Sequence, residues 1–236
     1  MVLDVSFMKE TFGTLWTGVP VTLSLTFLSL VLAAPAAFYA AVLRLHGARW
    51  GAGAVRWYVS FVRGTPIILQ ILLLYSLLPS VLNALVQAAG LPINIFEAVD
   101  PFWYAVVVFT LNTIALLSEV FRSALLAIPS GQREAGLSIG LTEVQTYVHI
   151  IIPQALTVAL PAICNITVNL VKGTSLAFLM TVKDVMAVGK VAAAYGYNYV
   201  EAYLDVFVLY LILCTVIQIG YSLLEHRFGR FRQQAA

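Results

Sequence analysis

The feature that most restricts the fold of this sequence is a series of long, almost uninterrupted apolar stretches. Such stretches are long enough to cross the hydrocarbon core of a bilayer, which takes about 20 helical residues. Only 10% of the 236 residues are charged, whereas soluble domains carry about 25%. In lipid every backbone polar group needs a partner within the protein, which leaves helices or closed β-barrels. Because the stretches do not alternate with period two, the sequence predicts an all-α integral membrane protein.

Five membrane-spanning helices account for the pattern. We expect them at residues 15–43, 57–78, 102–126, 161–182 and 202–224. Gly64 and Pro66 interrupt the second segment, and Pro79 closes it. The first segment follows acidic and basic residues rather than a basic region and has no cleavage site after it, so we expect a retained membrane helix.

The connections on one side of the membrane are expected to be largely irregular. Residues 80–101 are predicted to hold a short surface helix, and residues 183–201 a loop with a partial helix. No linker or internal repeat divides the chain. Residues 1–236 are therefore expected to form a single transmembrane domain.

The placement of lysine and arginine predicts the orientation. Nine arginines lie on one side: Arg44, Arg49, Arg56, Arg63, Arg122, Arg133, Arg227, Arg230 and Arg232. Three lysines lie on the other: Lys9, Lys183 and Lys190. This bias predicts an external N-terminus, a cytoplasmic C-terminus and a multi-pass protein of the cytoplasmic (inner) membrane.

Several kinds of chemistry have no support in the sequence. It contains no GxxxxGK[ST] phosphate loop and no GxSxG nucleophile motif. The histidines His46, His149 and His226 lack metal-ligand spacing, and Cys164 and Cys214 lie in apolar stretches. The net charge of +2 does not indicate nucleic-acid binding. We therefore expect no catalytic residues, no metal and no cofactor on this chain. Its function is expected to be transport or binding rather than catalysis.

A polar connection interrupts this apolar chain between Gly131 and Leu156. Its pattern predicts two short helices, the first capped by Ser130 and ended by Gly140. Thr142 and Gln145 have the spacing of a capping box, which begins the second helix. Pro153 indicates a break or a new first turn.

Two interpretations of this connection remain open on physical grounds. It is either an amphipathic linker on the membrane surface or a docking site for a cytoplasmic partner. Ala135 and Gly136 are small enough to let a partner approach closely, and Glu134 offers a charge beside them.

The segment EAGLSIGL, followed by IIIPQAL, resembles the EAA loop of ABC importer permeases. Glu134, Ala135, Gly140 and Pro153 match that pattern. Gly136 departs from the usual alanine, which is expected to weaken the local helix by about 1 kcal/mol. The resemblance continues in VRGTPIILQ, LNTIALLSEVFRSAL, IPSGQ and KGTSLAFL, which are similar to the polar amino-acid branch of that family, and covers about residues 14–227. Leu116 stands where many members carry tyrosine.

This resemblance implies a type I ABC importer (MetI-like) permease fold with five transmembrane helices. It implies that residues 129–153 form coupling helices in a groove of an ATP-binding subunit, with Glu134, Ala135, Gly136, Gly140 and Pro153 as coupling residues. The implied partners are a second permease subunit, as a homo- or heterodimer, two ATP-binding subunits that hold ATP and magnesium, and an extracytoplasmic substrate-binding protein. Polar amino acids are the implied substrates.

Polar residues within the apolar segments are candidates for the substrate pathway. Lys172 is costly in lipid, about 2.5–3.5 kcal/mol at the bilayer centre, so it is expected to face protein or water. It either binds a substrate carboxylate or holds helices together by pairing with Glu119 or a carbonyl. Asn165 and Asn169 share its helix face. The remaining candidates are Thr65, Gln70, Asn112, Glu119 and Ser175, with a structural pair between Glu119 and Arg122 favoured over substrate contact.

Two other functions remain as alternatives to the importer. A secondary transporter or channel would use the intramembrane polar residues without an ATPase. A structural membrane protein would use the polar loop only to recruit a soluble partner.

Overall fold

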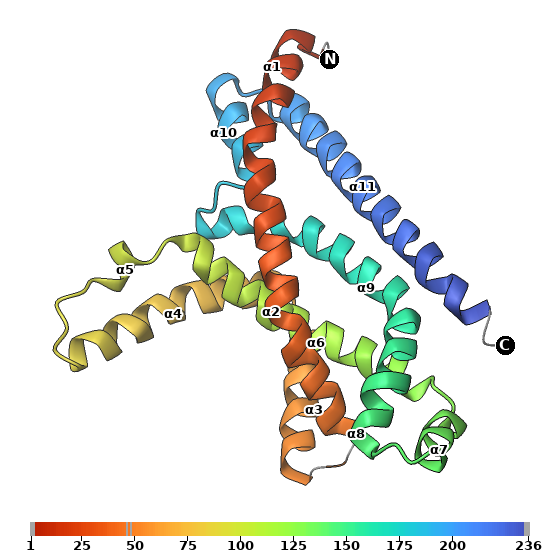
Figure 1. Ribbon diagram of the computed structural model, residues 1–236. Helices are drawn as coiled ribbons and strands as arrows, with labels where there is room; N and C mark the ends of the chain where they lie inside the picture. Colours follow the sequence, from red (N-terminus) through yellow and green to blue (C-terminus); the bar gives the residue numbers. More distant parts are fainter. Residues whose placement is uncertain (1–2, 46, 48, 234–236) are drawn as a thin grey trace.

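The structure, a computed structural model, describes residues 3–45, 47 and 49–233, so His46 lies outside the described residues. All elements within these ranges are helical (Figure 1). In chain order they are α1 (Val5–Leu15), η1 (Trp16–Gly18), α2 (Val19–Leu45), α3 (Arg49–Gly64), α4 (Ile67–Ala88), α5 (Ile95–Ala98), α6 (Pro101–Leu126), α7 (Ser130–Ser138), α8 (Glu143–Thr146), η2 (Tyr147–Ile151), α9 (Ile152–Thr174), η3 (Ala177–Met180), α10 (Val185–Gly196) and α11 (Tyr199–Gln233).

Five helices of the described chain are long and apolar enough to cross a membrane, which confirms the predicted all-α membrane architecture. They are Val5–Leu45, Ile67–Ala88, Pro101–Leu126, Glu143–Thr174 and Tyr199–Phe228. The third agrees with the predicted segment to within one residue, and the fifth extends beyond the prediction at both ends.

The second segment differs most from the prediction. α3 and α4 are separate helices, and the break at Gly64 to Pro66 places the membrane-spanning part at Ile67–Ala88 rather than at residues 57–78. Pro79 lies inside α4 instead of ending it. A proline removes only one helical hydrogen bond, and neighbouring groups in a transmembrane helix compensate for it.

The first and fourth segments also begin earlier than predicted. α1, η1 and α2 follow one another directly, so the polar residues of α1 extend the first helix. The fourth runs from Glu143 to Thr174, and after a turn at residues 175–176 the short 3₁₀ helix η3 covers Ala177–Met180. The connection at residues 183–201 holds the whole helix α10, and the connection at 80–101 holds only the four-residue α5 after the end of α4.

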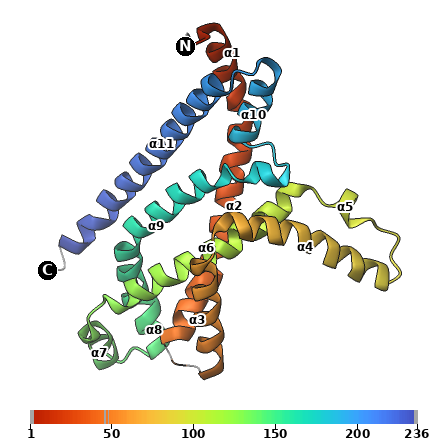
Figure 2. The same cartoon turned by 180° about the vertical axis from the view of Figure 1, so that it is seen from behind.

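Helix α6 lies at the centre of the molecule and packs against α2 and α9 (Figures 1 and 2). Ala33, Ala37 and Ala41 line the buried face of α2, where Leu117 and Phe121 of α6 meet them. Small residues let membrane helices approach closely, since association in lipid depends on packing and not on the hydrophobic effect. This packing holds the polar side chains of α6 in place.

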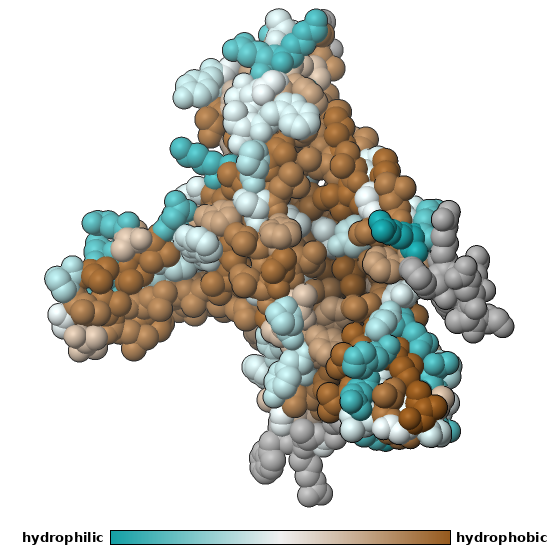
Figure 3. Space-filling model, viewed as in Figure 1, coloured by the Kyte–Doolittle hydropathy of each residue, from teal (hydrophilic) through white to brown (hydrophobic). Residues whose placement is uncertain are grey.

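The two ends of the molecule are polar and the middle is apolar (Figure 3). α1 and α10 lie at one end, and α7 and α8 at the other, which we call the α7 end (Figure 1). Gly18 makes the first end compact, because a Cβ there would lie 2.6 Å from the backbone nitrogen of Val185. α4 extends away from the other helices, with most of its apolar surface exposed.

Candidate functional site

The polar connection forms a compact pair of short helices at the α7 end. α7 ends at Ser138, and Gly140 follows with a φ of +87°, the left-handed conformation that was predicted to stop this helix. Thr142 and Gln145 form the predicted capping box, in which the Thr142 N–H donates to Gln145 Oε1 at 2.9 Å and the Gln145 N–H to Thr142 Oγ1 at 3.3 Å. The predicted cap at Ser130 is wrong. Ser130 is the first residue of α7, and no side chain caps this helix.

The second short helix continues without a break into α9. Residues Tyr147–Ile151 form a π-helical turn, and Pro153 is in the first turn of α9. Proline has no N–H to donate, so a wider turn before it is a common way to keep the helix continuous. Pro153 therefore lies in a first helical turn, as one of the two predicted alternatives had it, but it makes no break, and the π-helical turn joins the loop directly to a membrane-spanning helix.

At Gly136 the backbone of α7 lies against this continuous helix. Gly136 is buried, and a Cβ at this position would lie 2.7 Å from Thr146 Cγ2 and 2.8 Å from Thr146 Oγ1. The expectation that glycine merely weakens α7 is therefore incomplete, because the absence of a side chain here lets the two helices touch.

An ion pair also joins the two short helices. Arg133 Nε donates to Glu143 Oε2 at 3.0 Å, and a second contact links the same two side chains. The hydrogen bond to the carboxylate of Glu143 raises the pKa of Arg133. Gln154 Nε2 of α9 donates to Gln132 Oε1 of α7 at 3.2 Å, which adds a third connection.

The outer surface of this helix pair is free to meet another protein. Glu134 and Ala135 are exposed. Ile139 and Val144 are 76% and 73% exposed beside them, and Figure 3 shows apolar and hydrophilic side chains mixed over this end. Exposed apolar side chains bordered by polar ones are typical of a protein-binding surface.

The structure brings together three of the predicted pathway residues. Gln70 Nε2 donates to Thr65 Oγ1 at 2.8 Å and to the Val62 carbonyl at 2.8 Å. Asn112 Nδ2 donates to Gln70 Oε1 at 3.1 Å. The amides therefore bridge the break between α3 and α4 to the central helix α6, and they supply hydrogen-bond partners where the helical backbone is interrupted.

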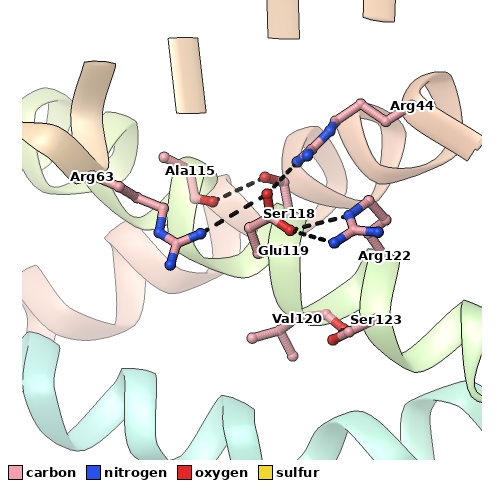
Figure 4. Close-up of polar contacts among 8 residues, drawn as sticks. All are labelled: Arg44, Arg63, Ala115, Ser118, Glu119, Val120, Arg122 and Ser123. Carbon is pink, nitrogen blue, oxygen red and sulfur yellow. Dashed lines mark hydrogen bonds and ion pairs between the residues drawn. The ribbon is translucent and has the colours of Figure 1, made fainter. Parts of the chain in front are cut away.

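Glu119 is surrounded by arginines from three helices (Figure 4). Its Oε1 accepts from Arg44 NH1 of α2 at 2.6 Å, and its Oε2 accepts from Arg122 Nε at 3.0 Å. Arg63 NH1 of α3 lies 3.9 Å from Oε1. The predicted structural pair between Glu119 and Arg122 is present. The proposed alternative pair between Glu119 and Lys172 is wrong, because the arginines occupy the carboxylate.

Lys172 lies on an open face of α9. Asn165, Asn169 and Lys172 are all exposed, and their side chains form no hydrogen bond or ion pair with the described part of the chain. Ser175 is half-buried and its Oγ donates to the Lys172 carbonyl at 2.7 Å. The stripe therefore does not join Glu119, Gln70 or Asn112 within one chain.

Asp184 is a functional candidate that sequence reasoning missed. It is fully buried between the spans, where its Oδ1 accepts from the Ala187 N–H at 2.9 Å and its Oδ2 from the Tyr210 hydroxyl at 3.1 Å. Burial raises the pKa of this carboxyl. An aspartate directly before an apolar helix is a cap signal, but its burial depends on the approach of α11. Within the described ranges, no three His, Cys, Asp or Glu side chains are placed to hold a metal.

Comparison with known proteins gives consistent results. The family model described as "Binding-protein-dependent transport system inner membrane component" matches residues 33–230. The chain is 34% identical over 228 residues to the probable amino-acid permease protein YxeN of Bacillus subtilis, covering 97% of this chain and 95% of that protein. It is 32% identical to the octopine transport system permease protein OccM of Rhizobium radiobacter, covering 95% and 90%.

Solved structures show the same fold. A chain of an amino acid ABC transporter solved with histidines has a TM-score of 0.79 and 26% identity, covering 96% of this chain and 100% of that one. A chain of the MetNI methionine ABC transporter, in an inward-facing conformation, has a TM-score of 0.68 and 20% identity, covering 96% and 99%.

Proposed function

Since this chain belongs to the family of binding-protein-dependent transport system inner membrane components and is a membrane-spanning permease subunit of an ABC importer, we propose that it forms the translocation pathway for polar amino acids. ATP hydrolysis on a separate subunit, which holds ATP and magnesium, drives the transport. Residues 1–236 act as one transmembrane domain, and residues 129–153 are its coupling loop.

The observation that carries this proposal is the rigid, exposed helix pair at the α7 end. Glu134, Ala135 and the neighbouring apolar side chains face outward, while Gly136, the Arg133–Glu143 ion pair and the π-helical turn tie the pair to α9. A partner that moves this pair moves a membrane-spanning helix with it. Such rigid-body motion favours either an inward-open or an outward-open arrangement of the membrane helices.

The pathway residues fall into two groups in this proposal. Thr65, Gln70 and Asn112 form a bonded network, and Glu119 is held by arginines, so these residues shape the interior of the subunit. Asn165, Asn169 and Lys172 form an exposed polar stripe, with Ser175 at its end. A polar stripe on a membrane-spanning helix is costly against lipid. It is best satisfied by a water-filled pathway shared with a second permease subunit.

The assembly has a second permease subunit, two ATP-binding subunits and an extracytoplasmic binding protein. The α7 end and the C-terminus face the cytoplasm, and the N-terminus lies outside. The clustering of arginine near α3, α7 and the end of α11 supports this orientation. Family membership favours this importer over a secondary transporter or channel.

The test is to purify the full chain with its co-purifying subunits and to measure ATP hydrolysis in proteoliposomes. We expect an ATPase to co-purify and a polar amino acid, delivered with its binding protein, to stimulate hydrolysis. Transport of an amino acid without any ATPase would contradict the importer and support the secondary transporter. An ATPase that binds but never responds to amino acids would contradict the substrate class.

The orientation is tested by thiol labelling in intact cells. Cys164 and Cys214 are first replaced by serine, and Ala98→Cys and Gln132→Cys are introduced separately at exposed positions. An impermeant reagent should label Ala98→Cys in intact cells and Gln132→Cys only after permeabilisation. The reverse pattern would invert the orientation.

A further inference from the structure

A cavity of about 450 Å³ lies between α2, α3 and α6 at the side of the molecule that carries Glu119. Arg44, Arg56 and Arg63 line it, and Glu119 is its acidic residue. Three helices thus contribute charged side chains to one hollow. Neither the coupling loop nor the Asn165–Lys172 stripe includes these arginines.

The charges in this cavity are not balanced. Glu119 carries one negative charge, which three guanidinium groups share at 2.6 Å (Arg44), 3.0 Å (Arg122) and 3.9 Å (Arg63). Arg56 lines the same cavity and forms no ion pair with any described residue. Three arginines and one carboxylate line the cavity, which leaves an excess of two positive charges. The single carboxylate offsets this charge only in part, so a further anion among the guanidinium groups would be stabilised.

The length of α6 places the cavity near one boundary of the hydrocarbon core. Helix α6 has 26 residues, or about 39 Å of helix, which exceeds the hydrocarbon core of about 30 Å. Glu119 lies seven residues before its end at Leu126, about 10 Å along the axis. With Pro101 at one boundary of the hydrocarbon core, Glu119 would lie about 27 Å from it, close to the opposite boundary.

An exposed aromatic pair stands beside the cavity on α3. The rings of Trp57 and Phe61 are stacked, with 5.4 Å between centroids and an interplanar angle of 8°, and both side chains are exposed. In sequence they directly follow Arg56 and Ser60, which line the cavity, so they lie on the adjoining stripe of α3. Tryptophan is enriched where protein crosses from hydrocarbon to headgroup, so an acyl chain has an apolar surface next to the arginines.

We propose that this cavity binds the phosphodiester headgroup of an anionic phospholipid. Guanidinium groups match the geometry of phosphate oxygens and retain their charge, and basic pockets between transmembrane helices are a recognised form of headgroup site. The aromatic pair favours a lipid over free phosphate, because it covers part of the acyl chain. The headgroup would connect α3, through Arg56 and Arg63, to α2, through Arg44.

The test uses the full chain purified with its co-purifying subunits and native mass spectrometry of bound phosphatidylglycerol against phosphatidylcholine. Arg56→Gln with Arg63→Gln removes two charges from the cavity. Lys183→Gln with Lys190→Gln removes two charges at the opposite end and is the matched control. Arg56→Lys with Arg63→Lys keeps the charge and checks that the assembly survives substitution at these sites.

We expect retention of phosphatidylglycerol to fall by roughly tenfold or more in the glutamine variant of the cavity, as the loss of two arginine contacts implies. The control should bind as the unsubstituted protein does, and the lysine variant should keep most of its preference. Equal retention in all variants would overturn the site. An equal loss of phosphatidylglycerol in the control variant would show only general electrostatic attraction and would overturn a specific site at the cavity. Displacement of the lipid by millimolar inorganic phosphate, or by the transported amino acid, would assign the cavity to that anion instead.

Discussion

The substitution Gly136→Ala has two opposite effects on the stability of α7. Alanine stabilises a helix interior by about 1 kcal/mol relative to glycine, so propensity alone predicts a more stable α7. The new Cβ would lie 2.7 Å from Thr146 Cγ2, 2.8 Å from Thr146 Oγ1 and 3.1 Å from Ile150 Cδ1. Overpacking of this kind costs about 1–3 kcal/mol.

Rotation of Thr146 does not relieve the clash. The side chain has two heavy atoms on its Cβ and three staggered positions, and two of those positions face the new methyl group. Every rotamer therefore leaves at least one heavy atom in contact. We expect α7 to be destabilised against α9 by about 1 kcal/mol after the gain in propensity.

The second substitution, Thr146→Ala, tests the cause. Thr146 Oγ1 is buried and has no hydrogen-bond partner within the described residues, so its removal deletes an unsatisfied group as well as the clash. In the double variant the methyl group introduced at position 136 occupies the space that the threonine side chain leaves. The double variant should be at least as stable as the unsubstituted protein. In a double-mutant cycle the interaction energy between the two positions would then be stabilising, whereas Gly136→Ala alone is destabilising.

Hydrogen exchange of the amides in residues 130–140 measures this local stability. A loss of about 1 kcal/mol raises the exchange rate about fivefold in Gly136→Ala, and the double variant should return to the original rate or slower. Transport per ATP hydrolysed should follow the same order, since a loosened α7 transmits less motion. Slower exchange in Gly136→Ala alone would refute the packing argument and leave helix propensity as the dominant effect.

Three further substitutions test other parts of the molecule. Glu134→Lys reverses an exposed charge on the proposed docking surface, so the ATPase or its stimulation should be lost while membrane insertion persists; normal transport with the ATPase bound would contradict this. Lys172→Met should preserve assembly and basal ATP hydrolysis but reduce uptake at least tenfold, about 1.4 kcal/mol; uptake near the original rate would remove Lys172 from the pathway. Burial raises the pKa of Asp184, so the folded protein binds a proton at this carboxyl more tightly than the unfolded chain does. The protonated carboxyl therefore adds to the free energy of unfolding in full below pH 3.8, the ordinary pKa, and this contribution is lost as the pH rises through the raised pKa. Asp184→Asn keeps an N-cap acceptor and should remove that decline, as thermal midpoints at about pH 4 and pH 7 would measure; parallel pH profiles would contradict it.

The features that the sequence determined by itself depend on properties of single segments. An apolar stretch enters lipid because its own side chains favour transfer from water, and five such stretches could be identified without knowing their neighbours. The capping box at Thr142 and Gln145 and the left-handed Gly140 close hydrogen bonds within a few residues. Such local features could be predicted because no distant contact competes with them.

Helix boundaries were less predictable because hydropathy does not mark hydrogen bonds. Pro79 lies within α4, and polar residues of α1 extend the first helix. The sequence pattern placed the break near Gly64, but whether α3 belonged to the membrane span depended on where it packed.

The partners of polar side chains were decided by the tertiary structure. Glu119 could have paired with Lys172 or Arg122, and the packing of α2 on α6 brought Arg44 from 75 positions away to within 2.6 Å. From its helix propensity, Gly136 was expected only to destabilise α7. The structure places Thr146 against it, so that a side chain at position 136 would clash. Lys172 was left on an open face by the same packing. Ion pairing and close contact depend on where helices cross, and that depends on all the side chains between them.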